Sequence, residues 1–219
     1  KTFDYDHASV ALDTTIAQNV HKLGTHHNCT FFVTLLTAFQ GLMARLSGAK
    51  DLVVGIPMAH QSSLDNGHLV THGAYTVPLR GRPGADQPFA EHLRQVRGQF
   101  LDAQAHPLAT FGNLVNRLKL PRDPSRTPLV DVVFNIDRLG AAFDFGDLRV
   151  RGVDTPKTLS NAELSVNVVD DGRSAVVECH YNRAILDGET VERWLRLYVA
   201  ALQRLAAAPQ LSLADAFAP

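Results

Sequence analysis

The feature that most constrains this chain is a helical stripe of apolar residues that leads directly into a short, nearly all-apolar strand. The stripe recurs at steps of three and four residues, which is the period of an α-helix with a wide buried face. Its members are Phe32, Leu35, Leu36, Phe39, Leu42, Met43 and Leu46. Thr30 or Asn28 is a natural N-cap, and "SG" at 47–48 ends the helix. The stretch "DLVVGIP" that follows is typical of a strand covered on both faces.

The same pattern analysis predicts the other elements. A helix begins at a cap on Asp13 or Thr14 and runs to about His21, and a second is capped by Asp86. A third begins near Asp187. The other expected strands cover 7–12, 68–80, 129–137, 146–153 and the two arms of a hairpin that turns at Asp171-Gly172. Helices that alternate with strands in this way predict an α/β sandwich with a mixed sheet.

Composition excludes several classes of function. Formal net charge is -1, and the 21 basic residues are scattered, so nucleic-acid binding is not expected. No apolar run reaches the length of a membrane span, and the first residues lack the apolar core of a signal peptide. Cys29 and Cys179 lie 150 residues apart with no CxxC partner, which favours free thiols. We therefore expect a cytoplasmic protein.

The stretch "HHNCTFF" at 26–32 raises the question of a reactive or metal site. His26 and His27 are adjacent, so at a helix start they diverge and cannot share one metal. His68 and His72 fall in an expected strand, where residues four apart are separated by about 13 Å. We therefore predict no metal site. Nucleophile elbows and phosphate-binding loops are absent, and Cys29 is more typical of an inert small apolar residue.

Three polar stretches are unusual for a plain scaffold. "RDPSRTPL" at 122–129 is interpreted either as a turn with Asp123 paired to Arg126 or as a functional motif. "FNIDR" brings Asn135, Asp137 and Arg138 into an otherwise apolar strand, where polar groups need partners or a wet cavity. A third strand carries His72 and Tyr75 and ends near Arg80.

These residues together resemble the C-terminal half of the condensation domains of non-ribosomal peptide synthetases. "LVTHGAYTVPLR" is similar to the family segment that precedes an arginine, here Arg80. "AHPLATFGNL" resembles the family's His-Gln-Asp-x-x-Phe motif, with His106 and Phe111 retained. "RDPSRTPL" (Arg122, Asp123, Ser125 and Arg126) matches the next motif almost letter for letter. "FNIDR" and "NAELSVNVVDDG" resemble a branch seen in hybrid polyketide–peptide assembly lines.

The resemblance also implies what is missing. Family chemistry centres on His-His-x-x-x-Asp-Gly, whose second histidine assists attack of the acceptor amine on a carrier-bound thioester. That motif requires Asp four residues after the second histidine, where this chain has Phe31. Residues 1–219 are therefore expected to form a single C-terminal subdomain without the N-terminal catalytic lobe, and no catalytic residue is assigned.

The family implies a chloramphenicol-acetyltransferase-like lobe with a mixed, mostly antiparallel sheet flanked by helices. Such a lobe supplies a tunnel wall, a floor loop, a latch and part of a carrier-protein docking surface. Candidate tunnel residues are His72, Tyr75, Asn135, Asp137 and Arg138; candidate structural residues are Arg80, His106, Phe111, Arg122, Asp123, Ser125 and Arg126. A bridging segment is expected near 155–165.

The expected partners are the N-terminal lobe, carrier-protein domains and neighbouring adenylation or polyketide synthase modules. No cofactor is expected to bind the chain itself, and the phosphopantetheine arm of a carrier protein is expected as the substrate tether. The isolated chain is expected to be inactive. Two alternatives are a non-catalytic carrier-binding module and a stand-alone CoA-dependent acyltransferase.

Overall fold

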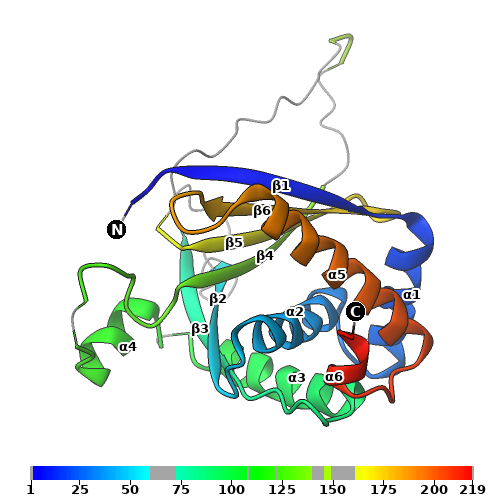
Figure 1. The fold of residues 1–219 in the computed structure, drawn as a ribbon, viewed down its shortest axis with the longest axis horizontal. Coiled ribbons are helices and arrows are strands. Elements are labelled where there is room, and N and C mark those ends of the chain that lie inside the picture. The colour runs from blue at the N-terminus through cyan, green and yellow to red at the C-terminus, as the bar shows by residue number, and fades with distance from the viewer. Residues whose placement is uncertain are drawn as a thin grey trace.

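The computed structural model is an α/β sandwich in which one mixed sheet carries helices on a single face (Figure 1). It describes residues 2–59, 73–107, 109–121, 123–139, 146–148 and 161–218. The strands are β1 (Tyr5–Leu12), β2 (Leu52–Ala59), β3 (Ala74–Gly81), β4 (Val132–Arg138), β5 (Leu164–Asp170) and β6 (Ala175–Asn182). The helices are α1 (Thr14–His26), α2 (Phe31–Ser47), α3 (Phe89–Ala105), α4 (Phe111–Leu118), α5 (Gly188–Ala207) and α6 (Leu213–Ala216).

The strand order is β1-β6-β5-β4-β2-β3. The β1–β6, β5–β6 and β2–β3 pairs are antiparallel, whereas β2–β4 and β4–β5 are parallel. The sheet is therefore mixed, as the sequence pattern predicted, and mostly antiparallel, as the family resemblance implied. Each parallel pair requires a long connection, and the connection from β2 to β4 runs through β3, α3 and α4.

Capping side chains and a glycine close in sequence account for most helix ends. The side chains of Asp13, Thr30 and Asp187 each accept a hydrogen bond from a backbone N–H in the first turn of α1, α2 and α5. Gly48 ends α2 at φ 69°, in the left-handed region that favours glycine. Gly172 has φ 84° and turns the β5–β6 hairpin. These caps and turns confirm the corresponding predictions.

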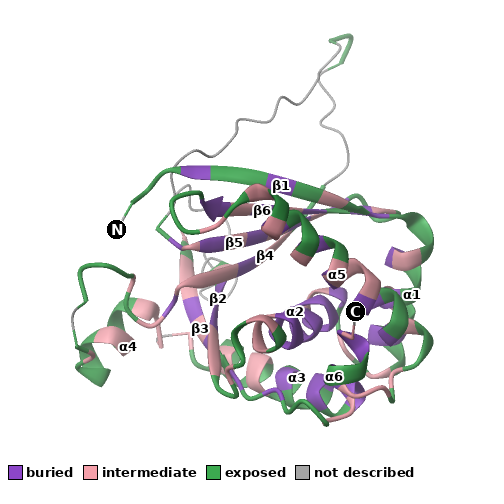
Figure 2. Cartoon of the chain, in the orientation of Figure 1, coloured by how far each residue is buried: buried purple, intermediate pink, exposed green. Residues whose placement is uncertain are grey.

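The core lies between the sheet and the helices (Figure 2). Aromatic rings connect the layers: Phe134 of β4 stacks on Phe39 of α2 at 4.9 Å between centroids, and Phe39 meets Tyr198 of α5 edge-on at 6.2 Å. The hydroxyl of Tyr198 donates to the Leu35 carbonyl at 2.8 Å, so this buried polar group is satisfied. The predicted apolar stripes of α2, α3 and α5 are the faces that contribute to this core.

Several predicted boundaries were wrong. The first strand begins two residues earlier, at Tyr5, and α1 continues to His26. Asp86 does not cap α3; Pro88 occupies the N-cap position and makes no side-chain cap bond. The first amide of α3 is satisfied instead by a tertiary bond from Phe89 N–H to the Leu211 carbonyl at 2.9 Å. The hydrogen bond expected from a nearby capping side chain is therefore made by a backbone carbonyl more than 120 residues further along the chain.

Some predictions lie outside the described residues. These are the first five residues of the strand expected at 68–80, the last five of the strand expected at 146–153 and most of the bridging segment near 155–165. No single helix among the described residues is long and apolar enough to cross a membrane. The α1–α2 pair passes that test of length and composition only when taken together across a 101° bend.

Candidate functional site

The sheet has two unlike faces. Burial alternates strictly along β5, with Leu164, Val166 and Val168 buried against the helices and Ser165 and Asn167 half-buried on the opposite side. No described helix covers that opposite side, which we call the open face. Its register continues across the neighbouring strands, because Asn135 of β4 and Glu178 of β6 both lie opposite Asn167.

A closed hydrogen-bond network lies on the open face. Asn135 Nδ2 donates to Asp137 Oδ1 at 3.1 Å and to Asn167 Oδ1 at 3.0 Å. Asn167 Nδ2 in turn donates to Asp137 Oδ2 at 3.0 Å. Both oxygens of the Asp137 carboxylate are therefore fixed by amides from two parallel strands. The sequence analysis identified Asn135 and Asp137 but missed Asn167, although its polar side chain interrupts the apolar run of β5.

Two histidines lie beside this network on the open face. His7 of β1 and His180 of β6 are paired in register, and their ring centroids are 6.0 Å apart. No group of three or more candidate metal ligands occurs among the residues that the structure describes.

The other candidate tunnel residues do not join the network. Side chains alternate along β4, so Arg138 lies on the helix face, next to Asp170 (Nε to Oδ2, 3.9 Å). Tyr75 pairs with Met58 and packs against the core, and β2 separates its strand from β4. The predicted grouping of Tyr75 and Arg138 with Asn135 and Asp137 on neighbouring strands was therefore wrong. His72 lies outside the described residues.

A histidine of α1 lies within electrostatic range of the Arg138–Asp170 pair. Burial lowers the pKa of His21 below its ordinary value, Asp170 opposes this shift, and Arg138 adds to it. The His21 ring also stacks on Phe31 at 3.8 Å between centroids. Sequence reasoning gave no signal for this cluster, because its members come from three elements far apart in the chain.

The "RDPSRTPL" link forms a compact turn with its own ion pair. Asp123 Oδ1 accepts hydrogen bonds from the backbone N–H of Ser125 at 2.8 Å and from its hydroxyl at 2.6 Å. Arg126 pairs with Asp131 rather than with Asp123, so the predicted pairing was wrong. Arg122 lies outside the described residues.

This link is joined to the start of β5. Thr127 Oγ1 donates to the Asn161 carbonyl at 2.7 Å, and Glu163 N–H donates to the Asp131 carbonyl at 2.8 Å. The Tyr5 hydroxyl donates to the Ala162 carbonyl from the other side. Residues 161–163 therefore form an anchor that is held by β1 and by the link before β4.

We predict that Arg126→Ala loosens this anchor with little effect on global stability. Exposed ion pairs contribute about 0–1 kcal/mol, so the free energy of unfolding falls by no more than about 1 kcal/mol. Amide hydrogen exchange at Glu163 and Leu164, which both donate to the Asp131 carbonyl, accelerates at least tenfold. Arg193→Ala removes an exposed pair on α5 and is the control. Unchanged exchange at Glu163 contradicts the anchor.

The two adjacent histidines end a helix rather than begin one, which corrects the sequence-based placement. His26 is the last residue of α1 and His27 is its C-cap, with ring centroids 5.1 Å apart. Cys29 follows, and its thiol donates to the His27 carbonyl at 3.4 Å. Burial raises the pKa of Cys29, as expected for an unreactive thiol.

The remaining candidate structural residues have local contacts. Arg80 Nε donates a hydrogen bond to Asp51 Oδ1 at 2.8 Å. Chiefly because of this interaction, the pKa of Asp51 is lowered to about 2. His106 is the C-cap of α3, and its Nδ1 lies 2.7 Å from the Asp102 carbonyl oxygen. Phe111 opens α4.

Helix α4 stands apart from the main body, at the left of Figure 1, and none of its residues is buried. Phe111, Leu114, Val115 and Leu118 nevertheless form an apolar stripe at helical spacing. A groove of about 930 Å³ lies between α4 and the end of α3, and one of about 610 Å³ lies between α4 and the link at 119–128. Phe111, Leu114 and Val115 are half-buried and Leu118 is exposed, so the stripe is only partly covered and is a candidate contact surface.

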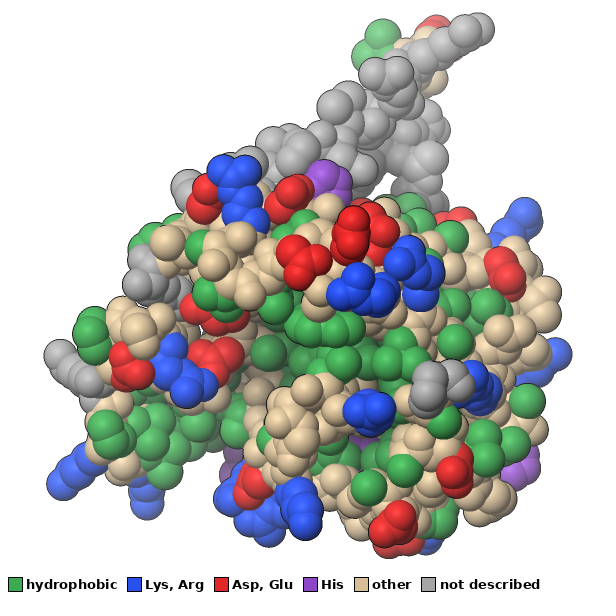
Figure 3. Space-filling view, viewed as in Figure 1, with side chains coloured by type: hydrophobic (Ala, Val, Ile, Leu, Met, Phe, Trp, Pro, Cys, Tyr) green, Lys and Arg blue, Asp and Glu red, His purple; other side chains and the backbone are tan. Residues whose placement is uncertain are grey.

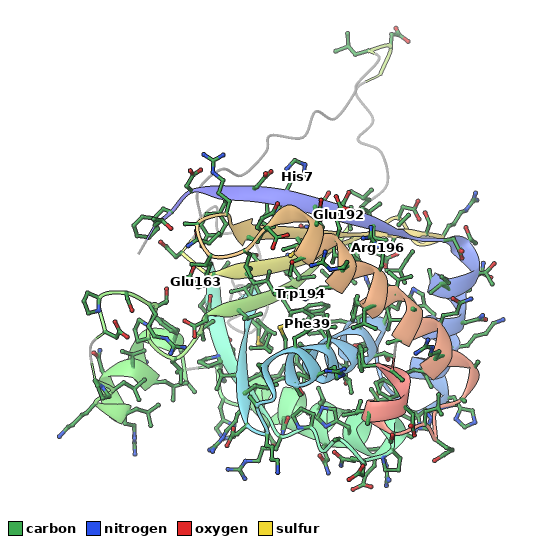
Figure 4. All side chains as sticks on the ribbon, in the orientation of Figure 1. His7, Phe39, Glu163, Glu192, Trp194 and Arg196 are labelled. Atoms are coloured by element: carbon green, nitrogen blue, oxygen red, sulfur yellow. The ribbon has the colours of Figure 1, made fainter. Side chains whose placement is uncertain are left out.

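Hydrophobic side chains also gather in the middle of the face that Figure 3 shows, where Figure 4 places Trp194 and Phe39 between α5 and α2. Phe39 is fully buried and Trp194 packs against the core. The space between them is only about 10 Å³, so this region is packed core and not a ligand pocket.

Comparison with known proteins identifies relatives of the whole chain. The family model described as Condensation domain matches residues 1–218. Tyrocidine synthase 2 of Brevibacillus parabrevis is 28% identical over 218 residues, which are 98% of this chain and 6% of that protein. Surfactin synthase subunit 2 of Bacillus subtilis (strain 168) is 28% identical over 216 residues, which are 98% of this chain and 6% of that protein.

Solved structures share the fold. The X-domain from teicoplanin biosynthesis aligns with a TM-score of 0.86 at 21% identity, covering 96% of this chain and 49% of that one. The condensation domain from the Monacolin K polyketide synthase MokA aligns with a TM-score of 0.84 at 21% identity, covering 95% of this chain and 48% of that one. The chain thus spans about half the length of these two solved domains and less than a tenth of the two synthases.

Proposed function

The chain belongs to the condensation-domain family of peptide synthetases, and on that premise we propose that it is the C-terminal lobe of such a domain. One observation carries the proposal: the chain matches about half of each of two solved relatives and leaves one face of its sheet without a described helix. Parallel strands such as β4 and β5 are normally covered on both faces. The open face would then turn toward a second lobe.

In this proposal the open face forms one wall of the substrate tunnel. Asn135, Asp137 and Asn167 are the wall residues, because their network is fixed, polar and uncovered by any described helix. The anchor at 161–163 supports a bridging segment by holding the point where β5 begins. Tyr75 and Arg138 are not assigned to this wall, since both lie on the helix face.

The reaction proposed is amide formation between substrates tethered to carrier proteins through phosphopantetheine arms. The general base would come from the N-terminal lobe, because the His-His-x-x-x-Asp-Gly motif does not occur in these 219 residues. Loss of a general base costs about 10²- to 10⁴-fold in rate, so this lobe alone is inactive. Two free cysteines support a reducing, cytoplasmic setting.

We propose that one carrier protein docks on α4. Three features support a contact with an apolar, acidic partner: the partly exposed apolar stripe, the two flanking grooves, and the basic side chains of Arg117 and Lys119. Adenylation or polyketide synthase modules would be the neighbours that load such carriers.

The test is complementation in trans. The purified chain is mixed with an N-terminal lobe that contains the histidine motif, together with loaded donor and acceptor carriers, and the amide product is quantified by mass spectrometry. We expect product only when both lobes are present. The positive control is the same pair of lobes fused in one polypeptide.

Two outcomes contradict the proposal. Product from the chain alone would show that it holds its own catalytic group. An active fusion that cannot be reconstituted from the separate lobes, with no binding between them, would show that the open face does not recognise a second lobe.

A further inference from the structure

A groove lies at the C-terminal end of α2, and it shares no residue with the open face, the anchor or α4. Its volume is about 570 Å³. Its walls come from the last turns of α2, the residues that link α2 to β2, the loop after β3 and the start of α6. The charged residues that line it are Arg45, Lys50, Arg82 and Asp86, and all its other lining residues are glycine, alanine, proline or leucine. The groove therefore combines an apolar lining with an excess of positive charge.

Close contacts between the segments hold these walls together. The Ala214 N–H of α6 donates to the Ala85 carbonyl at 2.9 Å, which joins α6 to the loop after β3. A Cβ atom at Gly41 of α2 would lie only 2.8 Å from the ring of Phe217, the residue that follows α6. Glycine at this position therefore allows α2 and the end of the chain to pack closely. The groove is preformed, as most small-molecule sites are.

The cations of the groove are only partly engaged by carboxylates. Arg45 and Lys50 are exposed, and neither forms a salt bridge with a residue that the structure describes. Arg82 Nε donates to Asp51 Oδ2 at 3.2 Å, but Arg80 donates to the same carboxylate, so two arginines share one negative charge. The positive charge at the groove is therefore available to an anionic ligand.

We propose that this groove binds a small organic anion that carries one acidic head group on an apolar body. Arg45 and Lys50 contact the head group, and the alanine and glycine residues of the walls contact the apolar body. The volume of about 570 Å³ lies within the range of about 300–1,000 Å³ that small-molecule sites occupy. This binding function goes beyond the proposed one, because it involves neither the tunnel wall nor the helix proposed to dock a carrier.

The lining selects this class of ligand. An inorganic anion is disfavoured, because it would meet the partial negative charge at the C-terminal end of α2 without burying apolar surface. A neutral apolar ligand would leave the cations of the groove unused. An acidic peptide presents carboxylates along an extended chain, whereas the cations here line one short groove. An anion attached to an apolar body satisfies both parts of the lining.

The experiment compares two fluorescent probes of similar shape. Anilinonaphthalene sulfonate has an apolar body and one anionic group, and phenylnaphthylamine has the same kind of body without the sulfonate. We expect the anionic probe to saturate a single site with a Kd of about 10–100 µM, as is typical for a ligand of this size. The neutral probe should bind at least tenfold more weakly. NMR on the isotopically labelled chain should show shifts at the amides of Ala49 and Ala85, which line the groove.

The decisive variant is Arg45→Gln/Lys50→Gln, which removes two positive charges without introducing negative ones. We expect it to weaken binding of the anionic probe about tenfold and to leave the neutral probe unaffected. The matched control is Arg94→Gln/Arg97→Gln, which changes two exposed arginines of α3 that line none of the grooves described above and should alter the affinity less than twofold. Circular dichroism confirms that both variants remain folded.

A second variant tests the apolar part of the site. Ala44→Phe places a ring in the groove from the exposed side of α2, and it should weaken both probes at least tenfold by occupying their space.

Four results would overturn the inference. These are equal affinities for the two probes, an unchanged affinity in Arg45→Gln/Lys50→Gln, shifts confined to the open face or α4, and displacement of the anionic probe by an acidic peptide that binds more tightly than the probe. The last result would assign the groove to a protein segment instead of a small ligand.

Discussion

Phe134→Ala should reduce the free energy of unfolding by about 3–5 kcal/mol, the largest effect we expect from a single substitution. Phe134 is 0% exposed and lies on β4 between two rings of α2, with centroid distances of 4.9 Å to Phe39 and 5.9 Å to Phe32. Removing its ring deletes contacts with both partners and leaves a cavity at the centre of the sandwich. Urea denaturation monitored by Trp194 fluorescence measures the loss.

Two further variants make this result interpretable. Phe134→Leu keeps most of the volume, so it should fold and lose only about 1–2 kcal/mol even if the alanine variant is unfolded. Phe3→Ala removes the same side chain at an exposed position, 48% accessible, and should change stability by less than about 0.5 kcal/mol. A loss below about 1 kcal/mol for Phe134→Ala would mean that α2 does not pack on β4 as described.

His92 should make the protein less stable in mild acid. It is 1% exposed on α3, and burial lowers its pKa from 6.5 to about 4, with Gln95 partly offsetting the shift. Between these two values the unfolded chain binds the proton and the folded chain does not. Stability is therefore complete above pH 6.5 and falls as the pH decreases toward 4, by about 3 kcal/mol in total.

The measurement is the free energy of unfolding at half-unit steps from pH 7 to pH 4. His92→Leu should remove most of this slope, because His21 and His27, whose pKa values burial also lowers, still contribute to it. His7→Gln, which changes an exposed imidazole on β1, should retain the full slope. Carboxylates with lowered pKa values, such as Asp51 at about 2, change the free energy of unfolding mainly below pH 4. They therefore do not obscure the effect of His92 between pH 7 and pH 4. A slope of unchanged size in His92→Leu would show that another group is responsible.

The parts that sequence predicted well depend on neighbours in the chain. The caps at Asp13, Thr30 and Asp187 and the turn at Gly172 each need only residues within a few positions. The apolar stripe of α2 needs only its own period. The alternation of side chains along "FNIDR" could also have been used for prediction. Residues 137 and 138 are adjacent in one strand, so their side chains must lie on opposite faces of the sheet. By that rule Arg138 belongs to the helix face once Asp137 is placed on the open face.

The parts that sequence did not predict depend on distant partners. Asp86 is a residue type that often caps helices, yet the first backbone N–H of α3, that of Phe89, donates to the Leu211 carbonyl instead. Arg126 has Asp123 close in sequence, but Asp123 is engaged by Ser125 and the arginine pairs with Asp131. In both cases several local solutions have similar energies, and a tertiary contact selects among them.

The sequence by itself determined most of the periodic elements, the caps at Asp13, Thr30 and Asp187 and the family resemblance, because each is encoded in short-range spacing or in motifs that keep their order. Only the tertiary structure decided which side chains share a surface. Asn167 joins Asn135 and Asp137 through the register of two parallel strands, and His21 of α1 comes within electrostatic range of Asp170 and Arg138. Register and packing are set by the burial of apolar area across the whole domain, which no local pattern specifies.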